Sequence, residues 1–144
     1  MIQHLLRKTL LKSVMTSPAI TVFELEDFSV VKDKFELYSI RHLPVVNHKG
    51  VLVGLITQRD LYKIHSPRRL QDGSWYYDKD LLDGFILSKV MLSEIYTLKP
   101  ENTLEDVVNA MVQFKFGCIP IVDDNNIPVG IITNDNILNF LLTK

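Results

Sequence analysis

The stretch VGLITQRD, residues 53–60, returns 76 positions later as VGIITNDN, residues 129–136. The same shift of 76 aligns residues 5–62 with residues 81–138 without a gap, and 14 of the 58 pairs are identical. An ungapped match of this length indicates an internal duplication. We therefore predict a first repeat over residues 1–62, a linker over 63–80 and a second repeat over 81–144.

Each repeat follows the same order of predicted elements. Residues 43–46 and 119–122 are rich in β-branched residues, and residues 51–56 and 127–132 follow them as return strands of hairpins. A helix precedes each hairpin, because apolar residues there recur three and four positions apart. One repeat has too few strands to bury both faces of a sheet. The predicted fold is therefore α/β (α+β), with two β-α-β-β-α units packed sheet to sheet about a pseudo-two-fold axis.

Composition excludes several classes of protein. The chain has 144 residues, 47% of them hydrophobic, with 16 Lys and Arg against 17 Asp and Glu. This apolar content excludes a disordered chain. No apolar run is long enough to cross a membrane, and no basic cluster exceeds two residues, so we predict a cytoplasmic protein without membrane or nucleic-acid binding. Residues 1–70 carry a charge of +5 and residues 71–144 a charge of −6, which fits an anion-binding surface, attraction between the halves, or chance.

Sequence features of catalysis are missing. The histidines at 4, 42, 48 and 65 lack the spacing of metal ligands, and the glycines form no phosphate-binding loop. Cys118, the single cysteine, precedes a predicted core strand, where a thiol is usually inert. We predict a protein that is not an enzyme and needs no metal or cofactor. Metal or redox sensing through Cys118 and the histidines is a weaker alternative.

Thr57 and Asp60 are the most informative polar pair. They lie where a strand passes into a helix, three residues apart, so that a hydroxyl and a carboxylate can face one spot. A carboxylate accepts two hydrogen bonds and suits the vicinal hydroxyls of a ribose. The same spacing is also typical of a helix capping box, in which the two residues satisfy only each other and the backbone. The residues alone leave both interpretations open.

The repeated motifs resemble a tandem pair of cystathionine-β-synthase-type (CBS) domains, also called a Bateman module. In the first repeat the matching motifs are VMTSP (14–18), HLPVV (42–46) and GLITxxD (54–60). In the second they are VM (90–91), CIPIV (118–122) and GIITxxN (130–136). The resemblance covers nearly the whole chain outside the linker.

The resemblance implies a non-catalytic sensor that binds AMP, ADP, ATP or S-adenosylmethionine in a cleft between the repeats. By that resemblance Thr57 and Asp60 hold the ribose, and Arg41 is the natural partner of a phosphate. The first site is expected to contain Thr16, Ala19, Ile20, Ile40, Arg41, His42, Pro44, Thr57 and Asp60.

The second repeat departs from the strict motif. Asn136 replaces the carboxylate and brings no charge, and Gly117 replaces Arg41. We therefore predict that the second site is weaker, empty or differently selective. Its expected residues are Leu92, Tyr96, Phe116, Gly117, Thr133 and Asn136.

The resemblance also implies a homodimer and an effector protein that is regulated in trans. The alternative is a structural dimerisation or scaffold protein with unoccupied clefts. Trp75-Tyr76-Tyr77 in the linker is expected to pack on a sheet edge or a dimer partner; covering a cleft or contacting the effector is the sharper possibility.

Overall fold

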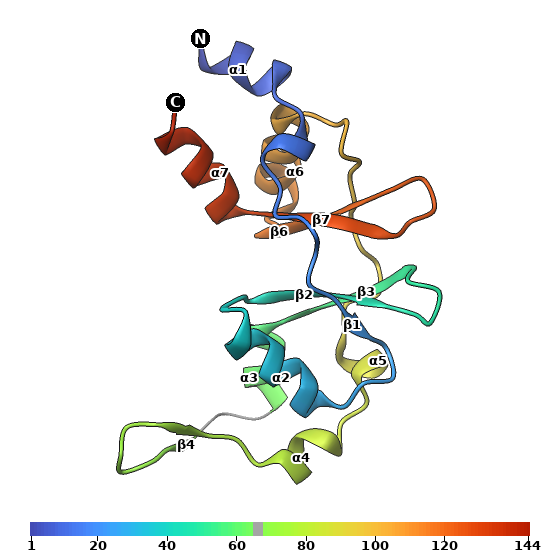
Figure 1. The fold of residues 1–144 in the computed structure, drawn as a ribbon, viewed down its shortest axis with the longest axis vertical. Coiled ribbons are helices and arrows are strands. Elements are labelled where there is room, and N and C mark those ends of the chain that lie inside the picture. Colours follow the sequence, from blue (N-terminus) through green and yellow to red (C-terminus); the bar gives the residue numbers. More distant parts are fainter. Residues whose placement is uncertain (65–67) are drawn as a thin grey trace. The chain divides into compact units, whose positions relative to one another are not determined.

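The computed structural model describes residues 1–64 and 68–144, which fold into two compact units (Figure 1). Unit 1 comprises Met1–Ala19, Gly50–Leu52 and Tyr96–Lys144. Unit 2 comprises Ile20–Lys49 and Val53–Ile95. Both units mix helices and strands, which confirms the predicted fold class.

Unit 2 is built on a three-stranded sheet of order β1-β2-β3, in which β1 runs parallel to β2. Apolar residues three and four apart on α2, namely Phe28, Val31 and Phe35, are buried in its core, as the helical spacing predicts. The elements are β1 (Val22–Phe23), α2 (Phe28–Leu37), β2 (His42–Val46), β3 (Leu52–Thr57) and α3 (Gln58–Ile64).

The second repeat contributes its opening segment to this core. Helices α4 (Lys79–Asp83) and α5 (Leu87–Val90) insert Leu82 and Leu87, which are buried among the residues of α2, β2 and β3. The Asp83 carboxylate accepts hydrogen bonds from the Ser29 N–H at 3.0 Å and the Ser29 hydroxyl at 3.2 Å. These contacts fasten α4 to the start of α2. An antiparallel hairpin of β4 (Arg68–Arg69) and β5 (Trp75–Tyr76) precedes α4.

Unit 1 is built on the antiparallel pair β6 (Cys118–Val122) and β7 (Pro128–Thr133). Helix α6 (Leu104–Phe114) begins with a capping box: the Thr103 N–H donates to Asp106 Oδ2 at 3.0 Å, and the Asp106 N–H donates to Thr103 Oγ1 at 3.3 Å. Helix α7 (Asn134–Leu142) follows β7 directly.

The first repeat contributes its opening segment to unit 1. Helix α1 (Ile2–Lys8) packs against α6, and the short 3-10 helix η1 (Leu11–Ser13) buries Leu11 completely beside Leu104. The Leu11 N–H donates to the Asn102 carbonyl at 2.8 Å. The two repeats have therefore exchanged their opening segments, since each segment packs on the strands of the other repeat.

The duplicated Val-Met and Gly residues meet across this exchange. Met91 lies against Gly54 of β3, and Met15 lies against Gly130 of β7, so closely that a Cβ atom on either glycine would clash with the methionine sulfur. Glycine is therefore needed at both positions, because the methionine side chain lies where a Cβ atom would be. Each contact joins one repeat's opening segment to the other repeat's return strand.

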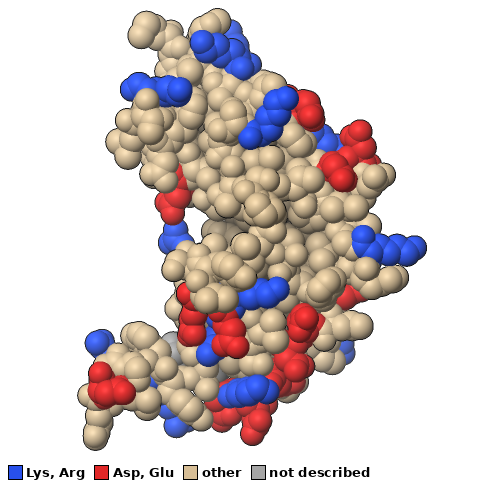
Figure 2. Space-filling model, viewed as in Figure 1, with Lys and Arg blue, Asp and Glu red and all other residues tan. Residues whose placement is uncertain are grey.

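Charge is unevenly distributed within each unit on the face shown in Figure 2. Lys and Arg side chains lie over the end of unit 1 that carries α1, and Asp and Glu side chains gather over the part of unit 2 that carries α4. No helix among residues 1–64 and 68–144 is long and apolar enough to cross a membrane.

Candidate functional site

Thr57 and Asp60 form a reciprocal pair at the junction of β3 and α3. Asp60 Oδ2 accepts hydrogen bonds from the Thr57 N–H at 2.9 Å and from the Thr57 hydroxyl at 3.0 Å. The Asp60 N–H donates to Thr57 Oγ1 at 3.2 Å. The capping box is therefore present, and it fixes the rotamer of the carboxylate.

The other oxygen of that carboxylate is left over. Among the residues that the structure describes, Asp60 Oδ1 has no recorded hydrogen-bond or ion-pair partner, and Asp60 is partly exposed. The neighbouring segment pairs through its backbone, since Leu55 and Leu92 exchange two N–H to carbonyl bonds of 2.9 Å. The side chain at 92 is apolar and offers no hydrogen bond to the carboxylate.

Unit 1 repeats this geometry with different chemistry. Asn136 Oδ1 accepts from the Thr133 N–H at 2.9 Å and from the Thr133 hydroxyl at 3.1 Å. The Asn136 side-chain NH₂ donates to Thr16 Oγ1 at 3.0 Å and to the Val14 carbonyl at 3.4 Å. Thr16 and Ile131 in turn exchange backbone hydrogen bonds of 2.9 and 3.0 Å.

The structure groups some of the predicted residues differently from the sequence. Thr16, expected beside Thr57 and Asp60, lies in unit 1 and contacts Asn136; Ala19 also belongs to unit 1. Leu92, expected with Asn136, lies in unit 2 and pairs with Leu55. The cause is the exchange of opening segments, which carries Thr16 and Leu92 to the other repeat's return strand.

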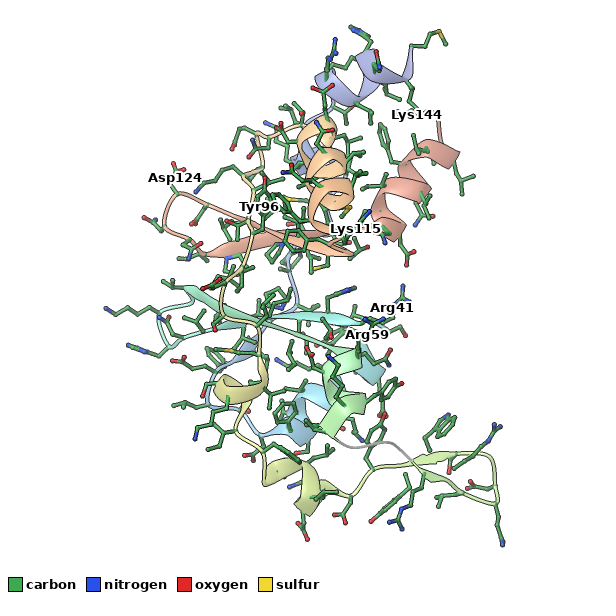
Figure 3. All side chains as sticks on the ribbon, turned by 180° about the vertical axis from the view of Figure 1, so that it is seen from behind. Arg41, Arg59, Tyr96, Lys115, Asp124 and Lys144 are labelled. Atoms are coloured by element: carbon green, nitrogen blue, oxygen red, sulfur yellow. The ribbon has the colours of Figure 1, made fainter. Side chains whose placement is uncertain are left out.

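Cations lie close to the start of α3. The Gln58 N–H donates to the Arg41 carbonyl at 2.9 Å, which fixes the Arg41 backbone beside the Thr57–Asp60 pair. Figure 3 shows Arg41 and Arg59 at this same end of unit 2. In unit 1 the equivalent bond joins the Asn134 N–H to the Gly117 carbonyl at 3.3 Å, and Lys115 is the labelled cation at that end. Arg59 was not predicted; only its place in the first turn after the strand could have indicated it.

The predicted apolar residues divide between the two units. Ile20 and Ile40 pack on the core of unit 2, where Pro44 is buried, and His42 begins β2. In unit 1 Tyr96 and Phe116 join Phe114 in an aromatic cluster, with ring centroids 5.5 to 5.8 Å apart. An aromatic cluster of this kind presents flat surfaces on which a planar ring can stack.

A surface cleft of about 750 Å³ lies elsewhere in unit 1. It is lined by residues of α1, η1 and the end of α7, including Leu5, Lys12 and Phe140. None of the predicted site residues contributes to it.

Within residues 1–64 and 68–144 the groups suited to metal or redox chemistry are not brought together. Among the described residues no three His, Cys, Asp or Glu side chains are placed to hold a metal ion, and His65 lies outside the described residues. Cys118 is a buried free thiol, and burial raises its pKa to about 12. A thiolate at this position is therefore strongly disfavoured near neutral pH.

Residues 11–66 and 87–143 each match the CBS domain family. The chain belongs to the CBS domain family. Its two CBS domains lie in tandem, as the repeated motifs predict, and CBS domain pairs are regulatory modules.

Solved CBS domain pairs share this fold. The CBS domain pair of protein MJ0100, in complex with 5′-methylthioadenosine and S-adenosyl-L-methionine, is 25% identical with a TM-score of 0.74, over 92% of this chain and 99% of that one. CBSX2 in complex with AMP is 20% identical with a TM-score of 0.76, over 94% and 97% of the two chains.

Among curated proteins the chain is similar to part of a longer one. It is 24% identical to the homoserine O-acetyltransferase of Methanococcus vannielii over 96% of its own length. It spans about a quarter (26%) of the length of that relative.

Proposed function

We propose that this CBS domain pair is a regulatory module that binds an adenosine-containing ligand, with Thr57 and Asp60 reading the ribose. The observation that carries the proposal is the divided role of the Asp60 carboxylate. Oδ2 is held by the Thr57 N–H and hydroxyl at 2.9 and 3.0 Å, while Oδ1 has no recorded partner among the described residues.

This arrangement suits a sugar hydroxyl for two reasons. The capping box fixes the carboxylate before a ligand arrives, so little side-chain entropy is lost on binding. A hydroxyl that donates to an ionised carboxylate forms a charge-assisted hydrogen bond, which is roughly twice as strong as a neutral one. A carboxylate with one free oxygen therefore favours a donor such as a ribose hydroxyl.

Another residue of the expected site suits a part of the ligand beyond the ribose. Arg41 lies beside the Thr57–Asp60 pair through the Gln58 contact and suits a phosphate or a carboxylate. The ligands of the two similar structures, AMP in one and S-adenosyl-L-methionine with 5′-methylthioadenosine in the other, share the adenosine part. AMP, ADP, ATP and S-adenosylmethionine are therefore the ligands to test.

Calorimetric titration with these four ligands tests the proposal. Wild-type protein should bind at least one of them, and Asp60→Ala should lose that binding. Asp106→Ala is the matched control, because Asp106 forms the same kind of capping box with Thr103 at the start of α6. If Asp106→Ala lost as much affinity as Asp60→Ala, the effect would come from helix capping and the proposal would fail.

We further propose that the ligand acts by changing contacts with a second copy of the chain or with an effector protein in trans. A ligand shifts such an equilibrium only if it binds the two arrangements unequally. The association state measured by analytical ultracentrifugation should therefore change with the binding ligand. A scaffold function is the alternative: it predicts a stable dimer and no binding of any of the four ligands.

A further inference from the structure

We propose that Thr16 occupies the side-chain NH₂ group of Asn136, which blocks the ribose-binding position of unit 1. The CBS domain pair would then bind a ribose only at Thr57 and Asp60 in unit 2. The inference rests on the proposed function of Thr57 and Asp60 and adds a residue that decides which of the two related positions is open. It is carried by the hydrogen bonds around Asn136.

The orientation of the Asn136 amide is fixed by its partners. The Thr133 N–H, at 2.9 Å, can only donate, so the amide oxygen must face it. The NH₂ group therefore faces the other way, toward Thr16 Oγ1 at 3.0 Å and the Val14 carbonyl at 3.4 Å. Both groups of the amide are thus used inside unit 1: the oxygen accepts two bonds and the NH₂ donates two.

Unit 2 offers the opposite arrangement at the equivalent atoms. Asp60 Oδ2 takes the place of the Asn136 oxygen, and Asp60 Oδ1 takes the place of the NH₂ group. Leu92 stands where unit 1 has Thr16, as the shift of 76 positions requires. A leucine cannot bond the carboxylate, so Oδ1 is left for a ligand.

The two differences act in the same direction. A ligand hydroxyl that reaches Asn136 must replace the Thr16 hydroxyl, and exchanging one neutral hydrogen bond for another brings little net gain. A ligand hydroxyl that reaches Asp60 Oδ1 replaces none of the protein groups that the structure describes and gains a charge-assisted bond. We expect the position in unit 1 to bind a ribose at least roughly tenfold more weakly than the position in unit 2.

Each residue must change for the position in unit 1 to open. In Asn136→Asp alone, the Thr16 hydroxyl, which accepts from the amide in the wild type, can turn to donate to the new carboxylate and so continues to occupy it. In Thr16→Val alone, the amide still brings no charge. The double variant T16V/N136D reproduces both features of unit 2, and valine has nearly the shape of threonine, so the fold should tolerate it. T16L/N136D, which copies Leu92, is a second variant if the first is unstable.

Isothermal titration calorimetry with 5′-AMP, run alongside thermal unfolding, is the experiment. Wild type should show one tight binding event per chain, each single variant also one, and T16V/N136D two. The reverse change L92T/D60N, which closes the position in unit 2, should remove the tight event. Titration of T16V/N136D with 2′,3′-dideoxy-AMP should lose both events, because the groups that are read are the ribose hydroxyls.

The outcomes separate this inference from the proposed function. No event in wild type but one in T16V/N136D would support the closure by Thr16 and overturn the proposed site at Asp60. Two equal events in wild type, or one event in both proteins, would overturn the closure and leave the site at Asp60 standing. No event in either protein, with 5′-AMP or with any of the other three ligands of the proposed function, would overturn both.

Discussion

Asp60 contacts Thr57 through a single carboxylate oxygen, Oδ2, which accepts both the N–H at 2.9 Å and the hydroxyl at 3.0 Å. One oxygen thus caps α3, and in the proposed function the other oxygen, Oδ1, accepts from the ligand. The two tasks can be separated by substitution.

Asp60→Asn should keep the helix cap but weaken ligand binding. The asparagine oxygen can accept from Thr57, as Asn136 accepts from Thr133, so the free energy of unfolding should change little. A ligand hydroxyl would lose its charged acceptor, and affinity should fall about tenfold. Asp60→Ala should lose the cap too and cost about 1 kcal/mol of stability. Urea unfolding and calorimetric titration of both variants measure the two effects; an unchanged affinity in Asp60→Asn would contradict the role of the charge.

Gly54→Ala should destabilise the protein by roughly 1–3 kcal/mol, because the added Cβ would overlap the Met91 sulfur in a packed region. The double variant G54A/M91A should recover part of that loss by removing the obstructing side chain. A thermodynamic cycle from urea unfolding of the four proteins gives the coupling. Purely additive effects would show that the cost of Gly54→Ala has another origin.

Asp83→Asn should lower stability at neutral pH and not in acid. The hydrogen bond and ion pair with Lys79 and the bonds from Ser29 lower the pKa of Asp83 below its ordinary value of 3.8. The stabilisation from ionised Asp83 is therefore fully present above the ordinary pKa of 3.8. It is lost as the pH falls through the lower pKa that Asp83 has in the folded protein.

Urea midpoints between pH 2 and 7 measure this dependence. Wild type and Asp83→Asn should differ by about 1 kcal/mol at pH 7 and converge at the acid end. Asp80→Asn, in the same helix, is the control and should follow wild type throughout. A difference that persisted at pH 2 would show that the lost contacts do not depend on ionisation.

Cys118 should not react with a thiol reagent in the folded protein at pH 8. Burial raises its pKa to about 12, so both the thiolate fraction and access are low. Labelling with 5,5′-dithiobis-(2-nitrobenzoic acid) should become fast only in denaturant. Rapid labelling of native protein would revive redox sensing through this residue.

The hairpin of β4 and β5 should be anchored by Tyr77 and not by Trp75. Tyr77 packs on the core of unit 2 with Lys32 Nζ 5.3 Å from its ring centroid, whereas Trp75 is 60% exposed and meets Arg69 at 5.5 Å. Tyr77→Ala should therefore cost about 1–3 kcal/mol, and Trp75→Ala less than about 0.5 kcal/mol.

Trp75 is the single tryptophan, so its fluorescence reports on the hairpin directly. Its emission should be that of an exposed indole and should not change with 5′-AMP. A blue shift on adding 5′-AMP would instead support the possibility that this hairpin covers a ligand.

Much of the fold could be predicted from the sequence because it depends on local patterns. The hairpin strands of the two repeats, the helix stripe of Phe28, Val31 and Phe35, and the capping box of Thr103 with Asp106 follow from local composition and spacing, whereas β4 and β5 lie in the segment predicted only as a linker. The destination of the opening segments could not be predicted, because the apolar spacing around Leu11 shows that it is buried but not against which strands.

In the candidate site, too, the contacts between residues close in sequence could be predicted and the contacts between distant residues could not. The reciprocal bonds of Thr57 with Asp60, and of Thr133 with Asn136, follow from residues three apart in the chain. The bond from Asn136 to Thr16 spans 120 positions, and only the structure brings its partners together. The sequence shows that an amide at 136 replaces the carboxylate at 60, but it does not show the hydrogen bond between Asn136 and Thr16.

The exchange of opening segments also sets the order in which the two units can complete their hydrophobic cores during synthesis. Leu11 belongs to the core that contains Ile132, and Leu43 to the core that contains Leu87. Unit 2 has its core residues once Leu87 and Met91 have left the ribosome, whereas the opening segment of the first repeat must wait for β7. The apolar side chains of the segment around Leu11 therefore stay exposed until the second repeat has been synthesised.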